Sequence, residues 1–104
     1  MEYVKLTDDD INLLKKAKDA QDKAYAIYSG FKVGAAVLTQ DNKIYTGCNI
    51  ENASYSLTIC AERVALFNAI SDCAGKIKMI AVIGPEDSPI SPCGACRQVM
   101  YELA

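Results

Sequence analysis

The sequence predicts one three-layer α/β/α domain spanning residues 1–104, in which a mixed β-sheet carries helices on both faces. The length of 104 residues is that of a single domain, and 51% of the residues are apolar, enough to build a core. Helix and strand patterns follow one another in the order α-β-β-α-β-α. The strand–helix–strand unit between residues 44 and 83 implies a right-handed crossover within one sheet.

The first element is predicted to be a helix that begins at Thr7 and reaches about Tyr25. Thr7 can cap its N-terminus, and the three acidic residues Asp8 to Asp10 suit the positive end of the helix dipole. Apolar residues then recur at steps of three and four, which is typical of an amphipathic helix. These residues are Ile11, Leu14, Ala17, Ala20 and Ala24. The run Tyr28-Ser29-Gly30 ends the pattern.

A β-hairpin is predicted next. Lys32 to Thr39 has the pattern of a strand rich in small residues, and Ile44 to Ile50 has that of a second strand. The intervening Gln40-Asp41-Asn42-Lys43 is composed of turn-forming residues. Two such strands around a short turn indicate a hairpin.

The second half of the chain is predicted to add a helix, a strand and a last helix. Thr58 to Cys73 has a helical pattern that closes near Gly75. Lys78 to Ile83 is a continuous apolar run suited to a strand buried on both faces. Pro92 then begins a helix over Cys93 to Glu102.

The helix pattern contains an unusually apolar stretch from Val64 to Ile70, in which only Asn68 is polar. A helix that is apolar on nearly all sides is expected to be buried on nearly all sides. A partner subunit is one cover for such a helix in a small domain. The alternative is that its alanines tolerate solvent, and the sequence leaves both open.

Composition excludes several classes of protein. The net charge is −2 and the basic residues are scattered, which argues against a face for binding long nucleic acid. The acidic N-terminus lacks a signal-peptide core, and the longest apolar run, Met79 to Ile83, is too short to span a membrane. We therefore expect a cytoplasmic protein whose five cysteines are thiols or metal ligands. The absence of histidine excludes histidine bases and histidine metal ligands.

Three cysteines stand at predicted helix starts, which is where a metal site can form. Cys60 opens one helix within Cys-Ala-Glu, and Cys93 and Cys96 open another within Pro-Cys-Gly-Ala-Cys. Helix N-termini lower thiol pKa values and favour the thiolate form. Three protein ligands with an open fourth position are typical of catalytic zinc. Such a Cys₃ arrangement, with Glu62 two residues after Cys60, resembles the metal site of zinc deaminases.

Four segments of this chain resemble those of the small cytidine deaminases, in that family's order. They are Tyr-Ser-Gly-Phe-Lys-Val-Gly-Ala-Ala at 28–36, Gly-Cys-Asn-Ile-Glu-Asn-Ala-Ser-Tyr at 47–55, Cys-Ala-Glu-Arg at 60–63 and Pro-Cys-Gly-Ala-Cys-Arg-Gln at 92–98. The similarity runs from about Leu6 to the last residue. It implies deamination of cytidine and deoxycytidine in pyrimidine salvage, by a homotetramer whose subunits share active sites.

The resemblance also implies a role for each matching residue. The implied zinc ligands are Cys60, Cys93 and Cys96, and the implied proton shuttle is Glu62. The implied substrate contacts are Asn49 and Glu51 on the ribose, Phe31 against the sugar or base, and Ala53 and Tyr55, the last two across a subunit boundary. Arg63 is implied to donate to the ligand sulfurs, which would offset the net charge of −1 that three thiolates leave on the site. Strand geometry independently places Asn49 and Glu51 on one face and Cys48 on the other.

The cysteines allow two other interpretations. Cys93 and Cys96 alone have the spacing of a redox dithiol, but that function leaves Cys60 and Glu62 unexplained. A structural zinc module needs a fourth ligand, for which Cys48 or Cys73 is available. Cys48 is expected to face away from the site, and Cys73 lies about 20 Å along the helix at ~1.5 Å per residue. Both are better interpreted as small buried apolar residues.

The chain stops at Tyr101-Glu102-Leu103-Ala104 without a glycine cap or a following strand. Members of the resembled family continue with further strands that help close the pocket. We therefore expect that the C-terminal part of the domain is missing or disordered, that the pocket is open and that activity is weak.

Overall fold

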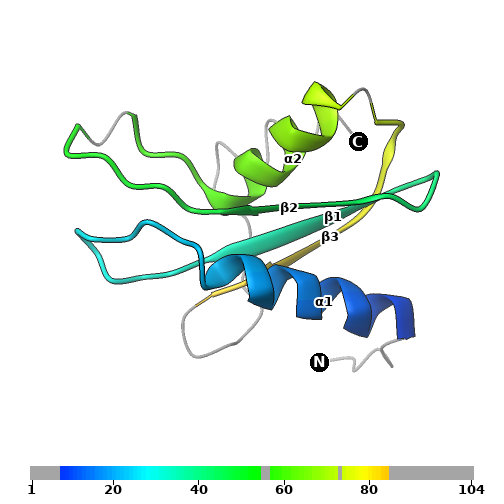
Figure 1. Ribbon diagram of the computed structural model, residues 1–104, viewed down its shortest axis with the longest axis horizontal. Helices are drawn as coiled ribbons and strands as arrows, with labels where there is room; N and C mark the ends of the chain where they lie inside the picture. Colours follow the sequence, from blue (N-terminus) through cyan, green and yellow to red (C-terminus); the bar gives the residue numbers. More distant parts are fainter. Residues whose placement is uncertain (1–7, 55–56, 73, 85–104) are drawn as a thin grey trace, which may run out of the picture.

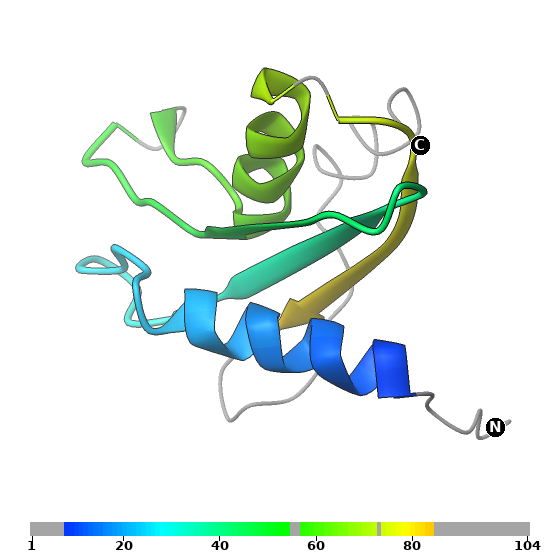
Figure 2. The ribbon, with the colours of Figure 1, turned by 45° about the vertical axis from the view of Figure 1, so that its right-hand side comes forward.

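The computed structural model describes residues 8–54, 57–72 and 74–84. Within them a three-stranded sheet lies between two helices, α1 (Asp8–Gln21) and α2 (Ala61–Ser71). Figures 1 and 2 show α2 on one face of the sheet and α1 on the other. The predicted three-layer α/β/α class is therefore confirmed. None of the helices in these ranges is long and apolar enough to cross a membrane.

The sheet consists of β1 (Gly34–Thr39), β2 (Ile44–Cys48) and β3 (Ile77–Ile83) in the order β2-β1-β3. Both ladders are antiparallel, with Ala36 opposite Thr46 on one side and Ala81 on the other. The described strands thus form an antiparallel sheet, and the expected mixed pairing is not found among them. Because β1 lies between β2 and β3, the two strands joined by the α2 crossover run in the same direction without pairing.

Alternating residues of β1 divide the core into two clusters. Ala35 and Val37 pack with Ala65 and Leu66 of α2. Ala36 and Leu38 pack with Leu13 and Ala17 of α1. Successive strand residues point to opposite faces, so one short apolar strand can serve both helices. This explains why every residue of β1 is buried.

Helix α1 corrects two predictions. It buries Leu13, Ala17, Ala20 and Gln21, whereas the predicted Ile11 is 41% exposed. It also ends at Gln21 and does not reach Tyr25, because the backbone of Tyr25 pairs elsewhere. Tyr25 N–H donates to the Asn49 carbonyl at 3.0 Å, and Tyr25 carbonyl accepts from Glu51 N–H at 2.8 Å.

Helix α2 begins at Ala61, three residues later than predicted. Ile59 is extended and exchanges two backbone hydrogen bonds with Ile50, both 3.0 Å long. A residue held in such a bridge cannot join a helix. The predicted C-terminal bound, Cys73, lies outside the described residues.

The strands differ from prediction at their ends. β1 begins at Gly34 and not at Lys32, and β2 ends at Cys48 and not at Ile50. In β3 only the last three residues are buried, so the prediction of a strand covered on both faces holds for that part alone. The predicted helix from Cys93 to Glu102 lies outside the described residues.

The apolar stretch of α2 leaves large side chains in solvent. Phe67 is 44% exposed and Ile70 is 48% exposed, whereas Ala65 and Ala69 are fully buried. The suggestion that alanines are the solvent-exposed part of this helix is therefore wrong, because its alanines face the sheet.

Gln21 joins three parts of the chain at the C-terminal end of α1. It is 5% exposed, and its Nε2 donates to the Lys32 carbonyl at 2.9 Å and to the Gly84 carbonyl at 2.8 Å. These two carbonyl groups lie outside the strands of the sheet, and Gln21 supplies the hydrogen bonds that buried backbone carbonyls require. Gln21 thus links α1 to the segment before β1 and to the end of β3.

Candidate active site

The candidate site is organised around the N-terminus of α2. Cys60 is the N-cap residue, with extended backbone angles of φ −76° and ψ 152°, and its side chain makes no capping hydrogen bond. The half-buried thiol therefore lies at the positive end of the helix dipole, where a thiolate is favoured. Cys48 and Cys60 form no disulfide within the described part of the chain.

Arg63 contacts Cys60 directly. Its Nη2 lies 3.7 Å from Cys60 Sγ and also donates to the Thr58 carbonyl at 3.3 Å. A guanidinium beside a sulfur stabilises negative charge on it, and donors to metal-binding thiolates tune the metal. This geometry agrees with the role that the resemblance implies for Arg63.

Glu62 lies in the first turn of α2 and is only 4% exposed. Burying an ionisable carboxyl group is costly, and a helix start can carry an acidic residue in solvent instead, so the burial of Glu62 indicates a role beyond helix stability. A group of this kind, two residues from a cysteine at a helix start, is suited to proton transfer.

Backbone pairing brings the predicted ribose segment beside Cys60. Ile50 is bridged to Ile59 on one side and to Tyr25 on the other. Asn52 N–H also donates to Thr58 Oγ1 at 3.0 Å. Residues 49–52 are therefore held next to the residues that lead into α2, although the sequence separates them by a loop.

Asn49 holds the segment that leads into β1. Its Nδ2 donates to the Phe31 carbonyl at 2.8 Å, and its Oδ1 accepts from Val33 N–H at 2.9 Å. Phe31 itself is 61% exposed, so its ring is available to a ligand. One Nδ2 proton of Asn49 and one lone pair of Oδ1 remain for other partners.

Glu51 contacts the same segment as Asn49, although both residues lie beyond the end of β2 and the predicted strand alternation does not apply to them. Glu51 Oε1 accepts from the backbone N–H groups of Tyr28 at 2.9 Å and Ser29 at 3.0 Å, and Oε2 accepts from the Ser29 hydroxyl. The Ser29 hydroxyl, followed by the backbone donors, holds the pKa of the Glu51 carboxyl below its ordinary value. Glu51 is thus ionised near neutral pH.

Cys48 lies on the other face of β2, as predicted. Tyr45 of the same strand packs on the α2 side and Ile44 packs on the α1 side. By alternation Cys48 shares the α1 side with Ile44, away from Glu62. Burial raises the pKa of its thiol, which disfavours the thiolate form.

The remaining predicted residues are placed as follows. Ala53 is exposed on the loop after β2. Tyr55, Cys73, Cys93 and Cys96 lie outside the described residues, so of the three predicted zinc ligands only Cys60 is described. Accordingly, no three potential metal ligands gather within residues 8–54, 57–72 and 74–84. Cys60, with a guanidinium beside its sulfur and a helix N-terminus beneath it, fits one ligand position of a thiolate zinc site.

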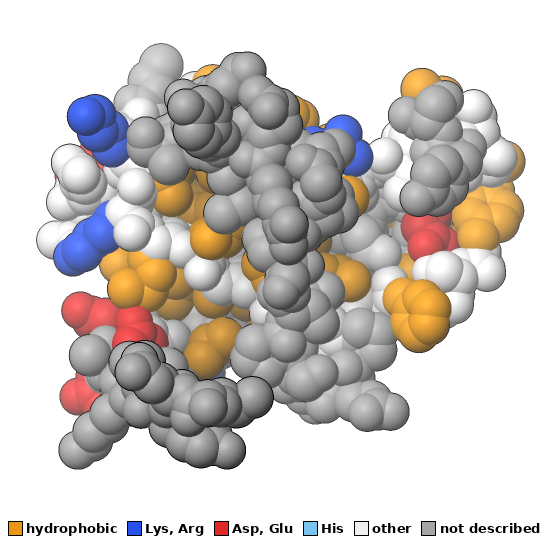
Figure 3. Space-filling model, turned by 180° about the vertical axis from the view of Figure 1, so that it is seen from behind, with side chains coloured by type: hydrophobic (Ala, Val, Ile, Leu, Met, Phe, Trp, Pro, Cys, Tyr) orange, Lys and Arg blue, Asp and Glu red, His pale blue; other side chains and the backbone are white. Residues whose placement is uncertain are grey.

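Exposed apolar side chains surround the predicted nucleoside segment. Figure 3 shows hydrophobic groups beside an acidic one at the end of the molecule formed by the loops before β1 and after β2. The large exposed apolar residues of these loops are Tyr25, Ile27, Tyr28, Phe31, Ile50 and Leu57. Such a rim is suited to packing against a planar base or a protein neighbour.

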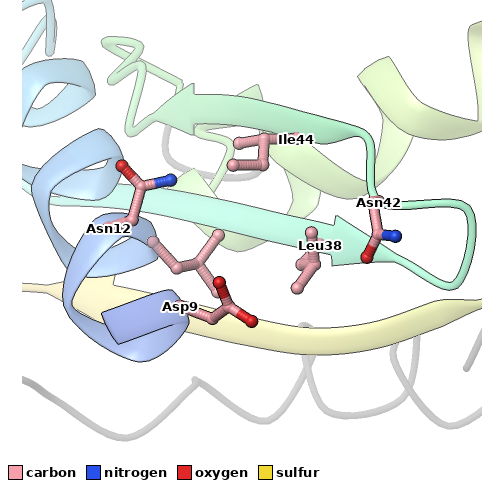
Figure 4. A pocket seen from close by; sticks show the side chains of 6 residues that line it. Asp9, Asn12, Leu38, Asn42 and Ile44 are labelled. Atoms are coloured by element: carbon pink, nitrogen blue, oxygen red, sulfur yellow. The ribbon is translucent and has the colours of Figure 1, made fainter. Parts of the chain in front are cut away.

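A separate hollow of about 300 Å³ lies on the α1 side of the sheet, opposite the side that carries Cys60 and Glu62 (Figure 4). It is lined by Asp9, Asn12, Leu13, Leu38, Asn42 and Ile44. Leu13 and Leu38 belong to the core cluster on the α1 side, whereas Cys60 and Glu62 belong to the α2 side. This hollow is therefore not the candidate site.

Sequence reasoning missed two residues that shape the site, Gln21 and Ser29. Gln21 interrupts the buried face of α1 with a polar side chain, and that was the available signal. Ser29 lies in the segment 28–36, where its sequence context indicates only the end of a helix. Its link to Glu51 spans 22 residues of sequence, which no local pattern reports.

Gly47 lets β2 approach α2 closely, and we expect Gly47→Ala to disturb the site. A Cβ at position 47 would lie 2.4 Å from the Ala65 backbone nitrogen and 2.6 Å from the Ala61 carbonyl oxygen. Since helix backbone cannot rotate away as a side chain can, α2 must shift. The free energy of unfolding should fall by at least about 2 kcal/mol, the scale of core overpacking.

Thermal unfolding followed by circular dichroism measures this effect, with a drop in Tm of roughly 10 °C expected. Gly75→Ala is the matched control, because its Cβ would meet only Asp41 Oδ1 at 3.8 Å. A Gly47→Ala protein as stable as the control would show that α2 moves without cost.

Comparison with known proteins identifies the family. Residues 7–104 match the model of the cytidine and deoxycytidylate deaminase zinc-binding region. A cytidine deaminase of Sporosarcina psychrophila is 53% identical over 91 residues, which are 88% of this chain and 67% of that protein.

Solved structures agree with the sequence comparison. The cytidine deaminase of Mycobacterium tuberculosis superposes with a TM-score of 0.88 at 41% identity, covering 94% of this chain and 79% of that one. The cytidine deaminase of Burkholderia pseudomallei gives 0.85 at 54% identity, covering 94% and 77%. The chain therefore belongs to the cytidine and deoxycytidylate deaminase family, and its metal cofactor is Zn²⁺.

Proposed function

We propose that this protein hydrolyses the exocyclic C–N bond of cytidine and 2′-deoxycytidine, giving uridine and 2′-deoxyuridine with release of ammonia. The observation that carries the proposal is the N-terminus of α2. There the buried Glu62 lies two residues from Cys60, whose sulfur Arg63 contacts. The neighbouring ionised Glu51 and the exposed Phe31 supply groups that can bind a sugar and pack against a base.

The proposed zinc ligands are Cys60, Cys93 and Cys96. Bound zinc would supply Lewis acidity that makes water a nucleophile near neutral pH. Arg63 would oppose the negative charge of the thiolates by donating to the Cys60 sulfur, 3.7 Å away. The chemistry then depends on where protons are held and delivered.

Glu62 would carry those protons. Its carboxylate takes a proton from the attacking water and delivers it to the pyrimidine ring nitrogen as the new C–O bond forms at C4. It then takes the proton of the new C4 hydroxyl group and passes it to the amino group, so that the C4–N bond breaks, ammonia departs and the C4 carbonyl forms. Because Glu62 is 4% exposed, bulk water has little access to the proton in transit.

Asn49 and Glu51 would hold the ribose, with Ala53 and Tyr55 as further contacts. Asn49 and Glu51 each retain hydrogen-bonding capacity after their bonds to the segment from Tyr28 to Val33 are made. An ionised carboxylate accepts strong hydrogen bonds from hydroxyl groups. This chemistry fits a free nucleoside, which brings no phosphate charge to an acidic chain.

We further propose a cytoplasmic homotetramer that serves pyrimidine salvage and shares its active sites between subunits. The support is the apolar surface of α2, where Phe67 and Ile70 are 44% and 48% exposed. The apolar rim around the nucleoside segment adds to it. Surfaces of this kind are typical of faces that pack against another protein.

Substrate choice tests the proposed function. We expect the protein to convert both cytidine and 2′-deoxycytidine, seen as a loss of the cytidine absorption band, and to leave cytosines in single-stranded DNA unchanged. The reason is that the chain has a net charge of −2 and its basic residues are scattered along the sequence. Comparable rates on a polynucleotide would contradict this proposal.

A further inference from the structure

We propose that Ser29 is a positioning residue for the nucleoside. Its hydroxyl orients the Glu51 carboxylate toward the ribose and holds the backbone of Phe31 in place. This inference rests on the proposed function, in which Glu51 and Phe31 bind cytidine. The Ser29 hydroxyl joins the two, since it donates to Glu51 Oε2 and accepts from Phe31 N–H at 3.0 Å.

The hydroxyl of Ser29 has its hydrogen directed by this pair of contacts. A serine hydroxyl has one proton and two lone pairs. The Phe31 N–H occupies one lone pair, and the only proton points at Glu51. The hydroxyl thus has a single orientation, and Glu51 receives a donor from a fixed direction.

Glu51 is left with one acceptor direction. A carboxylate offers about four lone-pair sites. Three are occupied by Tyr28 N–H, Ser29 N–H and the Ser29 hydroxyl. The remaining site lies on Oε2, the oxygen that Ser29 binds. A sugar hydroxyl that donates there would find the acceptor preorganised, which lowers the entropic cost of binding.

The surroundings of Ser29 indicate a role in binding more than in folding. Ser29 and its neighbours Tyr28, Gly30 and Phe31 are exposed, so its hydroxymethyl group fills no core space. Gly30 has φ +74° and open space around its Cα. Its N–H donates a hydrogen bond to the Ala26 carbonyl at 2.9 Å. The turn is therefore held by its own backbone, and removing one hydroxyl leaves it folded.

The test compares Ser29→Ala with Ser29→Thr, which keeps the hydroxyl. Ser29→Ala should raise KM for cytidine by about tenfold, the effect of one hydrogen bond to a charged group, and change kcat by less than about twofold. Ser29→Thr should restore most of the affinity. Ser71→Ala, an exposed serine at the far end of α2, is the matched control and should behave as wild type.

Two further measurements separate positioning from a general structural effect. Binding of uridine should weaken in Ser29→Ala while binding of uracil, which lacks the sugar, stays unchanged. In a Glu51→Gln background Ser29→Ala should add less than about a twofold loss, because residues that act through one another are not additive. The rise in KM on the acid side should also move to higher pH, since the Ser29 donor helps to keep the Glu51 pKa low.

The outcomes are distinct. The role of Ser29 would be overturned by any of three results. These are an unchanged KM in Ser29→Ala, a loss of affinity that Ser29→Thr does not restore, and a loss on Ser29→Ala that is as large in the Glu51→Gln background as in the wild type. A wild-type protein that binds uridine without consuming cytidine would contradict the proposed deamination alone, and uridine affinities would then test Ser29. A wild-type protein that binds neither nucleoside would overturn the ribose site and Ser29 with it.

Discussion

Glu62→Ala is expected to lower kcat/KM for cytidine by about 10³- to 10⁴-fold, the upper range for loss of a general acid–base group. The carboxylate is buried at 4% exposure in the first turn of α2. No other acidic side chain of the described residues is buried. Without Glu62, proton transfer between water, ring and leaving amine has no carrier at this position.

Zinc content and folding decide what the loss of activity means. Because Glu62 is proposed to be a shuttle and not a ligand, the Ala variant should bind zinc as the wild type does. Glu62→Gln keeps the shape and should be equally inactive, while Asp19→Asn on the exposed face of α1 should be fully active. Loss of zinc in Glu62→Ala would make Glu62 a ligand, and near-normal turnover would remove its catalytic role.

Cys60→Ala is expected to remove zinc and activity together. Wild-type protein should contain about one zinc per chain, and the variant below roughly a tenth of that, because a three-thiolate site does not survive the loss of a ligand. Metal analysis by mass spectrometry after dialysis measures this directly. The half-buried sulfur lies at the helix N-terminus and is contacted by Arg63.

Cys48→Ala is the matched control for the Cys60 variant. Cys48 lies on the α1 side of β2, on the face of the sheet opposite Cys60, and burial raises the pKa of its thiol. The Cys48→Ala protein should therefore bind zinc and turn over cytidine as the wild type does. If Cys48→Ala loses the metal, the ligand assignment is wrong. A wild-type chain with a Cys93–Cys96 disulfide and no zinc would favour a redox dithiol.

The fold class and the order of the first five elements could be predicted from sequence because both depend on local patterns. The run of small residues in β1, the turn at Gln40 to Lys43 and the apolar run of β3 are each contained in a few residues. The zinc-deaminase family was also predictable, since Cys60-Ala61-Glu62 and Pro92-Cys93-Gly94-Ala95-Cys96 are short and specific. The individual roles of these residues stay predictions until the variants above are measured.

Only the tertiary structure decided where the elements end and what the site residues contact. Tyr25 and Ile59 looked helical, but each pairs through its backbone with the segment around Ile50, and these long-range bonds outweigh local helix propensity. The buried face of α1 is set by Leu13 and not by Ile11, because the sheet selects which stripe it covers. The links from Gln21 to Gly84 and from Ser29 to Glu51 span 63 and 22 residues, and contacts at that separation exist only once the chain has folded.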